Sequence, residues 1–201
     1  MEGNQIQEDI HFIKKMIENN RRTLVDNGIM FISTGVYVFV GSTISYILGI
    51  YGKVDLLPVL WICLMAILIV FNLIIQRKAA KEQTKKTFSS KIFSATWSAC
   101  GIPIVIIAVL FFTTGKGSPQ ALFVSISSIL GIGYFLTGVI NDLKFMKVLA
   151  FGWWVGTVLS FLWEYIGEEY QLSLLFAVLI FVLEIFPGII IYKKWKRIYN
   201  E

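Results

Sequence analysis

The sequence predicts an all-α integral membrane protein with six transmembrane helices in three hairpins and an amphipathic helix at the membrane surface before them. Three observations lead to this fold class. Of 201 residues, 56% are hydrophobic and 15% are charged, with a mean hydropathy of +0.72, values outside the usual range of soluble domains. Six apolar runs approach the ~20 residues that cross a bilayer. Sixteen of the eighteen Lys and Arg residues lie on one side of these runs.

Residues 1–27 form the predicted amphipathic helix. Its apolar residues recur at helical spacing, at Ile6, Ile10, Ile13, Ile17 and Leu24. Such a segment is either an interfacial anchor for the first span or a docking surface for a soluble partner or another copy. Asp26-Asn27-Gly28 then predicts a break between this helix and the first span, because Gly allows a turn that other residues resist.

The six predicted spans form a bundle over residues 28–192, followed by a basic tail at 193–201. They cover residues 29–50, 56–76, 93–113, 119–141, 148–166 and 172–192. Short connections pair them into hairpins, around Gly52-Lys53, Gly115–Ser118 and Gly167–Gln171. Pro58 and Pro119 stand at the starts of two spans, where a missing amide proton costs little, and Ser118 is a suitable helix cap.

Basic residues set the predicted orientation, because Lys and Arg near span ends resist translocation. The side with few basic residues carries only Lys53 and Lys116. Both termini are therefore predicted to lie on the other, cytoplasmic side of an inner or plasma membrane. The basic side also provides predicted contacts for anionic lipid headgroups or a partner protein: Lys14, Arg21, Arg22, Arg77, Lys78 and Lys81. Nucleic-acid binding is not predicted, because membrane topology already explains the charge.

Small residues repeat every fourth position in several spans, and this pattern predicts close helix contacts in lipid. The clearest stripes are Gly41, Ser45 and Gly49, and Gly152, Gly156 and Ser160. These stripes are interpreted as contacts within the bundle, with a homo-oligomer as the open alternative.

Glu184 is the predicted centre of a site, about twelve residues into the sixth span and near the bilayer midplane. A carboxylate is costly there, so its side chain is expected to face protein or water. Pro187 predicts a kink beside it, since proline removes an intrahelical hydrogen bond. One interpretation is a site for a proton, a cation or a small molecule. The other is a neutral structural acid bonded to a polar residue on a neighbouring helix, for example Asn72, Ser127, Ser128 or Thr137.

Glu164 is the second acidic residue within a span, and it lies near the outer end of the fifth span between Trp163 and Tyr165. This pattern is typical of an aromatic belt with an acid reaching the interface. The alternative is an outer vestibule that attracts cations past Trp163. The predicted ligand- or ion-binding residues are therefore Glu184, Pro187, Asn72, Glu164 and Trp163.

Enzymatic chemistry is not expected. The single His11 and the separated Cys63 and Cys100 do not form a metal site, and no phosphate-binding loop or nucleophile motif is present. No cofactor is predicted, and no motif resembles a known family. Two function classes remain. The first is a small-molecule, lipid or ion binding and transport bundle, and the second is a non-transporting membrane subunit or regulator that engages a protein partner through its cytoplasmic segments.

Overall fold

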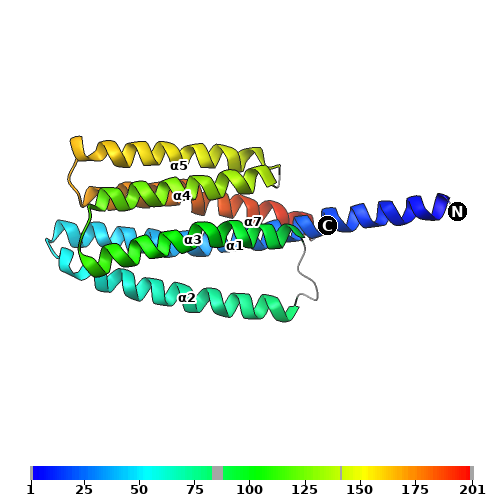
Figure 1. Ribbon diagram of the computed structural model, residues 1–201, viewed down its shortest axis with the longest axis horizontal. Coiled ribbons are helices and arrows are strands. Elements are labelled where there is room, and N and C mark those ends of the chain that lie inside the picture. The colour runs from blue at the N-terminus through cyan, green and yellow to red at the C-terminus, as the bar shows by residue number, and fades with distance from the viewer. Residues whose placement is uncertain (1, 83–87, 141, 200–201) are drawn as a thin grey trace.

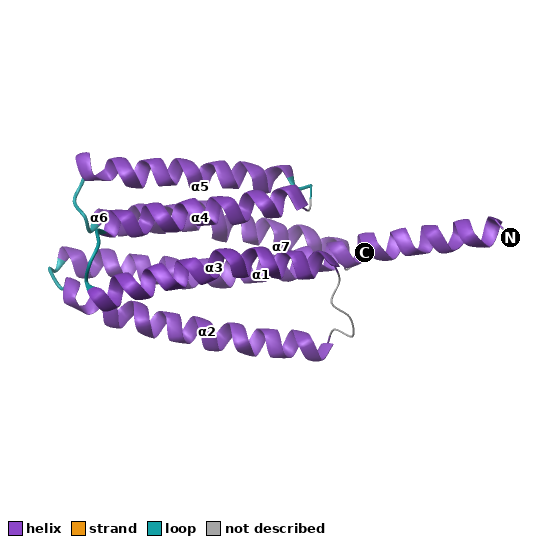
Figure 2. Ribbon diagram, in the orientation of Figure 1, coloured by secondary structure: helices purple, strands orange, loops and turns teal. Residues whose placement is uncertain are grey.

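The computed structural model describes residues 2–82, 88–140 and 142–199, with side chains chiefly over 28–71, 91–140, 142–163 and 165–193. All regular elements in these ranges are helical (Figure 2). Six helical segments are long and apolar enough to cross a membrane: Gly28–Ile50, Val54–Phe71, Lys91–Thr114, Pro119–Ile140, Lys144–Leu162 and Gln171–Lys193. The protein is therefore a multi-pass membrane protein, as the hydropathy pattern predicts.

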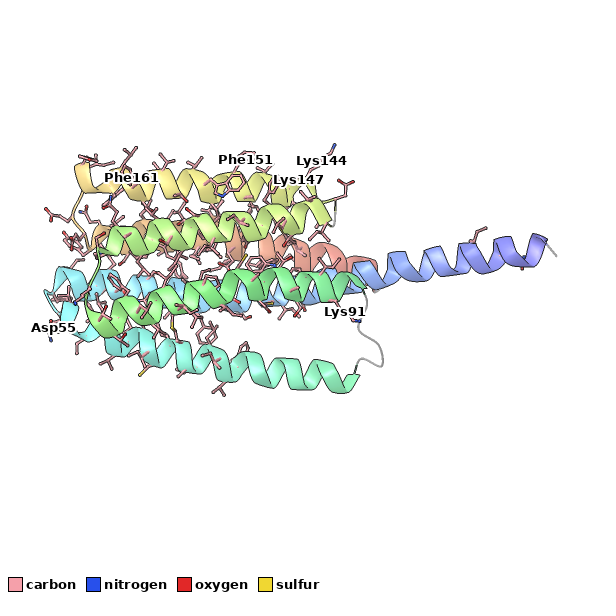
Figure 3. The ribbon with its side chains drawn as sticks, viewed as in Figure 1. Asp55, Lys91, Lys144, Lys147, Phe151 and Phe161 are labelled. Carbon is pink, nitrogen blue, oxygen red and sulfur yellow. The ribbon has the colours of Figure 1, made fainter. Side chains whose placement is uncertain are left out.

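The helices run up and down a single bundle (Figure 1). In order they are α1 (Glu2–Ile50), η1 (Val54–Leu56), α2 (Leu57–Glu82), α3 (Phe88–Thr114), α4 (Pro119–Ile140), α5 (Lys144–Leu162), η2 (Trp163–Tyr165), α6 (Gln171–Ile180), η3 (Phe181–Ile185) and α7 (Phe186–Tyr199). Both ends of the chain lie toward the same end of the bundle (Figure 1). We call it the inner end only as a label, after the orientation that the basic residues predict. Figure 3 shows Lys91, Lys144 and Lys147 at the inner end and Asp55 at the opposite, outer end.

The predicted break at Asp26-Asn27-Gly28 is wrong, because α1 continues through these residues as one helix. Its N-terminal part projects beyond the inner end of the bundle (Figure 1), and it would have to bend to lie along a membrane surface. The reason lies in packing. A Cβ atom at Gly28 would be 3.1 Å from the backbone nitrogen of Tyr192 and 3.3 Å from the carbonyl oxygen of Gly188. Gly28 therefore allows close approach of α7 to α1 instead of a turn.

The short outer connections are confirmed, and two of them use glycine for left-handed backbone. Gly52 has φ +66° and Gly115 has φ +61°, values that a residue with a Cβ atom rarely adopts. The predicted cap at the start of α4 is also present. The Ala121 amide donates to Ser118 Oγ at 3.1 Å, and Pro119 occupies the first position of the helix.

The small-residue stripes make the predicted contacts within the bundle. Cβ atoms at Gly152 and Gly156 would lie 2.7 and 2.8 Å from the side chains of Leu183 and Leu179, so α5 packs closely on the final span. The first stripe divides between two neighbours. Gly41 faces Trp61 and Leu64 of α2, whereas Gly49 contacts Tyr170 beside the final span.

The final span is interrupted at its middle, because the π-helical segment η3 separates α6 from α7. Its wider turn is marked by the amide of Phe186, which donates to the carbonyl of Phe181, five residues earlier. Pro187 has no amide proton for the carbonyl of Leu183, so a regular α-helical pattern cannot continue there. The irregularity predicted beside Glu184 thus takes the form of a π-helical turn.

Candidate functional site

Glu184 lies in the π-helical turn η3, with 5% of its surface exposed. Its Cγ atom is beside α1, since a Cβ atom at Gly35 would be 3.3 Å from it. No hydrogen bond or ion pair joins its carboxyl group to another described side chain. The side chains around the carboxyl group exclude water from it. In the described part of the chain, Glu184 is thus a buried acid without a polar partner.

Five aromatic side chains from four helices pack together toward the inner half of the bundle. They are Phe31, Phe93, Trp97, Tyr134 and Trp153, which we call the aromatic cluster. Tyr134 is at its centre, with ring centroids 5.3 Å from Phe31, 5.4 Å from Trp97 and 6.3 Å from Trp153. Glu184 lies against α1 at Gly35, four residues or about one helical turn from Phe31 of the cluster. The acid therefore lies beside a set of aromatic rings from α1, α3, α4 and α5.

The polar atoms of the aromatic cluster also lack partners. The Tyr134 hydroxyl and the indole nitrogens of Trp97 and Trp153 are buried, and none makes a hydrogen bond of good geometry. The Trp153 N–H is near the Tyr134 hydroxyl without meeting that geometry. Buried donors are normally satisfied, so three in one cluster require an explanation such as an occupant or a second conformation.

The cluster is tightly closed. Trp153 is fully buried and Tyr134 is 1% exposed, and the glycines of α1 and α5 bring the final span close on either side. Protons and single water molecules are the species small enough for such packing. A larger ligand requires the helices to separate, and the π-helical turn with buried Pro187 is the point where the final span has the fewest regular hydrogen bonds.

The structure brings together only some of the predicted site residues. Pro187 lies one turn from Glu184, but Trp163 begins η2 at the outer end of the bundle, about 20 Å from Glu184 along the bundle axis by helical rise. Its indole nitrogen is buried without a partner near Gly167. The side chains of Asn72 and Glu164 lie outside the described residues, as do those of the basic residues predicted to contact headgroups: Lys14, Arg21, Arg22, Arg77, Lys78 and Lys81.

The three hydroxyls predicted as partners of Glu184 have other surroundings. Ser127 is fully buried without a hydrogen bond. Ser128 donates to the carbonyl of Val124 at 2.8 Å, and Thr137 donates to the carbonyl of Gly133 at 2.7 Å. Ser128 and Thr137 thus donate to carbonyl groups of their own helix, while the interpretation of Glu184 as a structural acid stays a prediction.

Tyr134 is the residue that the sequence prediction missed. It follows Gly131 by three residues and precedes Gly138 by four, so it shares a helix face with two small residues. A tyrosine on a close-packing face cannot reach the interface with its hydroxyl. The spacing of Tyr134 from these two glycines was the signal in the sequence that its hydroxyl would be buried. Among the described residues no group of three His, Cys, Asp or Glu side chains is placed to hold a metal ion.

The fold and the site define a polytopic helical membrane protein with an unpartnered acid and unpartnered aromatic donors in its core. Comparisons of the chain with protein-family models, curated proteins and solved structures found no match.

Proposed function

We propose that this protein binds a proton or a small cation and moves it through the helical bundle, with Glu184 as the central binding group. The observation that carries the proposal is the burial of Glu184 in a π-helical turn without a hydrogen bond or counter-ion from the described residues. Ionisable residues inside a membrane are costly, and they usually mark ion or substrate pathways. Irregular π-helical turns are also frequent at functional sites.

The energetics favour a functional role over a structural one. Burying a polar group without a hydrogen bond costs roughly 1–3 kcal/mol in proteins. Among the described residues, three of the six buried side-chain groups without a hydrogen bond belong to the aromatic cluster. Such clusters of unsatisfied groups are typical of sites whose partner arrives during function.

The neighbouring residues fit a positively charged species. Phe31 and Tyr134 stack on each other here, so their electron-rich faces would attract a cation only after the rings separate, whereas the carboxylate of Glu184 supplies a negative charge directly. The closed packing favours a proton in the conformation described here. A larger cation would enter after the final span moves at the π-helical turn.

The test is ion uptake into liposomes that contain the full-length protein. With an inside-negative potassium diffusion potential, internal pH-sensitive and sodium-sensitive dyes report the entry of each cation. We expect uptake above that of empty liposomes, and we expect Glu184→Gln to reduce it to the empty-liposome rate. Asp55→Asn is the control, because Asp55 is exposed at the outer end, beside the first connection. Unchanged uptake in Glu184→Gln would refute the proposal.

The second candidate function is a non-transporting subunit or regulator, and the projection of α1 beyond the bundle favours it (Figure 1). A helix that extends past its bundle offers a surface for a cytoplasmic partner. Deletion of residues 1–25 separates the two functions. Cation uptake survives the deletion under the first proposal. A deletion that abolishes the cellular function while Glu184→Gln preserves it favours the second.

A further inference from the structure

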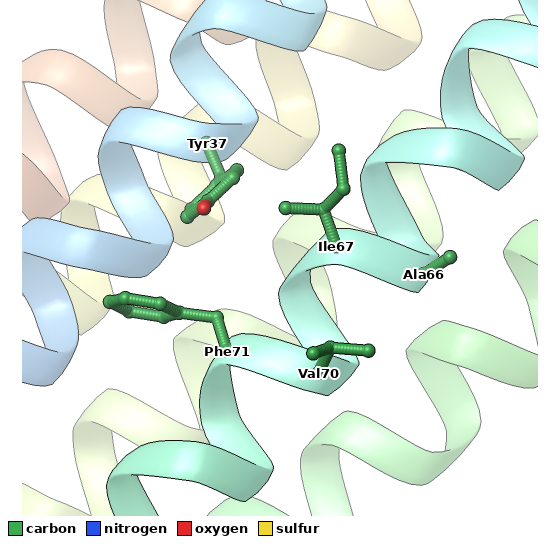
Figure 4. A pocket seen from close by; sticks show the side chains of 5 residues that line it. All are labelled: Tyr37, Ala66, Ile67, Val70 and Phe71. Atoms are coloured by element: carbon green, nitrogen blue, oxygen red, sulfur yellow. The ribbon is translucent and has the colours of Figure 1, made fainter.

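We infer that a groove between α1 and α2 binds one acyl chain of an anionic phospholipid, whose headgroup lies at the inner end of α2. The groove is lined by Tyr37, Ala66, Ile67, Val70 and Phe71, and we call it the α1–α2 groove (Figure 4). Its volume is about 390 Å³, and it is widely open along one side. The groove includes no residue of the aromatic cluster, and the inference does not depend on the function proposed for Glu184.

The groove exists because α2 contacts α1 closely only toward its outer end. There the Trp61 indole donates to Ser45 Oγ at 3.0 Å, and Gly41 lets Leu64 approach. Further inward the Tyr37 and Phe71 rings are 5.9 Å apart between centroids, and α2 diverges from the bundle toward the inner end (Figure 1). The groove therefore lies where the two helices begin to separate, and it opens to the surroundings of the bundle.

The lining of the groove fits a hydrocarbon chain. Its four α2 residues are all apolar, and Tyr37 contributes mainly its ring. In lipid, helices associate through van der Waals contact and interhelical hydrogen bonds, not through the exclusion of water. An acyl chain held between α1 and α2 would supply the contacts that their divergence removes.

The sequence register places positive charge on the same face of α2. Arg77, Lys78 and Lys81 follow Ala66, Ile67 and Val70 by eleven residues each, which is close to three full helical turns. They begin about 10 Å beyond Phe71 toward the inner end, roughly the distance from upper chain carbons to a headgroup phosphate. Cytoplasmic leaflets carry anionic lipids, and basic residues near the surface attract them.

A phospholipid fits the groove better than a helix from a second copy of the chain. Close helix pairs in membranes need small residues at the crossing, and Ala66 is the one small residue in the α2 part of the lining. The charge at the inner end also repels the identical charge of a second copy, whereas it attracts a phosphate.

The test compares two lipids with identical chains, phosphatidylglycerol and phosphatidylcholine, added to the purified full-length protein in detergent. At a hundredfold excess over Kd, we expect phosphatidylglycerol to raise Tm by about 5–10 °C. Phosphatidylcholine is expected to give a smaller rise. Native mass spectrometry is expected to show one tightly retained phosphatidylglycerol per chain.

Three variants locate the site. Ala66→Trp fills the groove and should remove most of the lipid-dependent rise in Tm. Ile69→Trp is the matched control, because Ile69 is exposed on α2 outside the lining, and it should keep the rise. Lys78→Gln should retain anionic lipid about five-fold more weakly, since each basic residue near the surface contributes that much.

Several results would overturn the inference. Equal stabilisation by both lipids would show that the basic residues of α2 do not bind the headgroup. An unchanged response in Ala66→Trp removes the groove from the site. A lipid-independent dimer that Ala66→Trp dissociates identifies a second copy as the occupant. None of these outcomes changes the result expected for Glu184→Gln in the uptake assay.

Discussion

Two transmembrane segments of this protein have nearly the same hydropathy and opposite surroundings. The α2 segment Val54–Phe71 has a mean hydropathy of 2.7 and no buried residue, while the final span Gln171–Lys193 has 2.8 and 44% of its most apolar window buried. Hydropathy therefore predicts that a helix crosses the membrane but does not indicate what it packs against. The α2 segment is surrounded mainly by lipid and the final span mainly by protein, and both surroundings are apolar.

The difference arises from neighbours instead of from the segments themselves. The final span is surrounded by glycines of other helices: Gly28 and Gly35 of α1, and Gly152 and Gly156 of α5. These residues let backbones approach closely, so large side chains of the final span become buried. On the α2 side, Gly41 is one such contact. Small residues on the partner thus decide where a transmembrane helix lies in a bundle.

The largest expected effect comes from filling a close contact of the final span. A Cβ atom at Gly188 would lie 3.2 Å from the backbone nitrogen of Ile32, which cannot move independently of α1. We expect Gly188→Leu to lower the free energy of unfolding by about 3 kcal/mol. Reversible unfolding in mixed micelles with increasing dodecyl sulfate measures it. Gly101→Leu is the control, since no atom lies within 4 Å of a Cβ atom there, and equal effects of the two substitutions would contradict the explanation.

The comparison between the two spans is tested most directly by the same substitution in each. Ile180 of α6 is 1% exposed and Ile62 of α2 is 51% exposed. Ile180→Ala leaves a cavity and should lower the free energy of unfolding by about 2 kcal/mol. Ile62→Ala changes only contacts with lipid or detergent and should cost less than about 0.5 kcal/mol. Similar losses at both positions would show that α2 packs against protein more closely than described.

Much of the fold was predictable because each span has its own signal. Apolar runs of the right length located six spans, and glycines marked the outer turns. The fifth span is Lys144–Leu162 instead of residues 148–166, so Glu164 lies just beyond it in η2. The helix through Asp26-Asn27-Gly28 was not predictable in the same way. Gly28 has the same propensity to break a helix in any sequence, and only its contact with Tyr192 and Gly188 shows that it serves close packing.

The candidate site was predictable in part for a related reason. The depth of Glu184 and the helix irregularity beside Pro187 follow from positions along one span. The position of Glu184 relative to the aromatic cluster depends on how the helices rotate about their axes, and periodicity within one apolar span does not report that rotation. Trp163 was predicted near the outer end of the fifth span, and it begins η2 directly after α5, far from Glu184 along the bundle. Local signals therefore located the acid, whereas its neighbours required the packed bundle.

A substitution of Glu184, in contrast, is expected to stabilise the final span. Because its carboxyl group has no described partner, replacing it with an apolar side chain of similar length removes an unsatisfied polar group. We expect Glu184→Met to raise the free energy of unfolding by about 1 kcal/mol while cation uptake is lost. Unfolding in mixed micelles and liposome uptake are measured on the same preparation. A loss of stability would instead support a structural role for the acid.

The smallest expected effect concerns the contact that joins α2 to the bundle. Trp61→Phe removes the hydrogen bond from the indole to Ser45 Oγ and keeps an aromatic ring to stack near Phe112. Interhelical hydrogen bonds in membranes contribute about 0.6 kcal/mol on average, so we expect Trp61→Phe to lower the free energy of unfolding by about that amount. A double-mutant cycle with Ser45→Ala isolates the pair, and a coupling energy near zero would contradict it. A helix without a buried residue in its apolar segment depends on such weak contacts, so its position responds to whatever fills the α1–α2 groove.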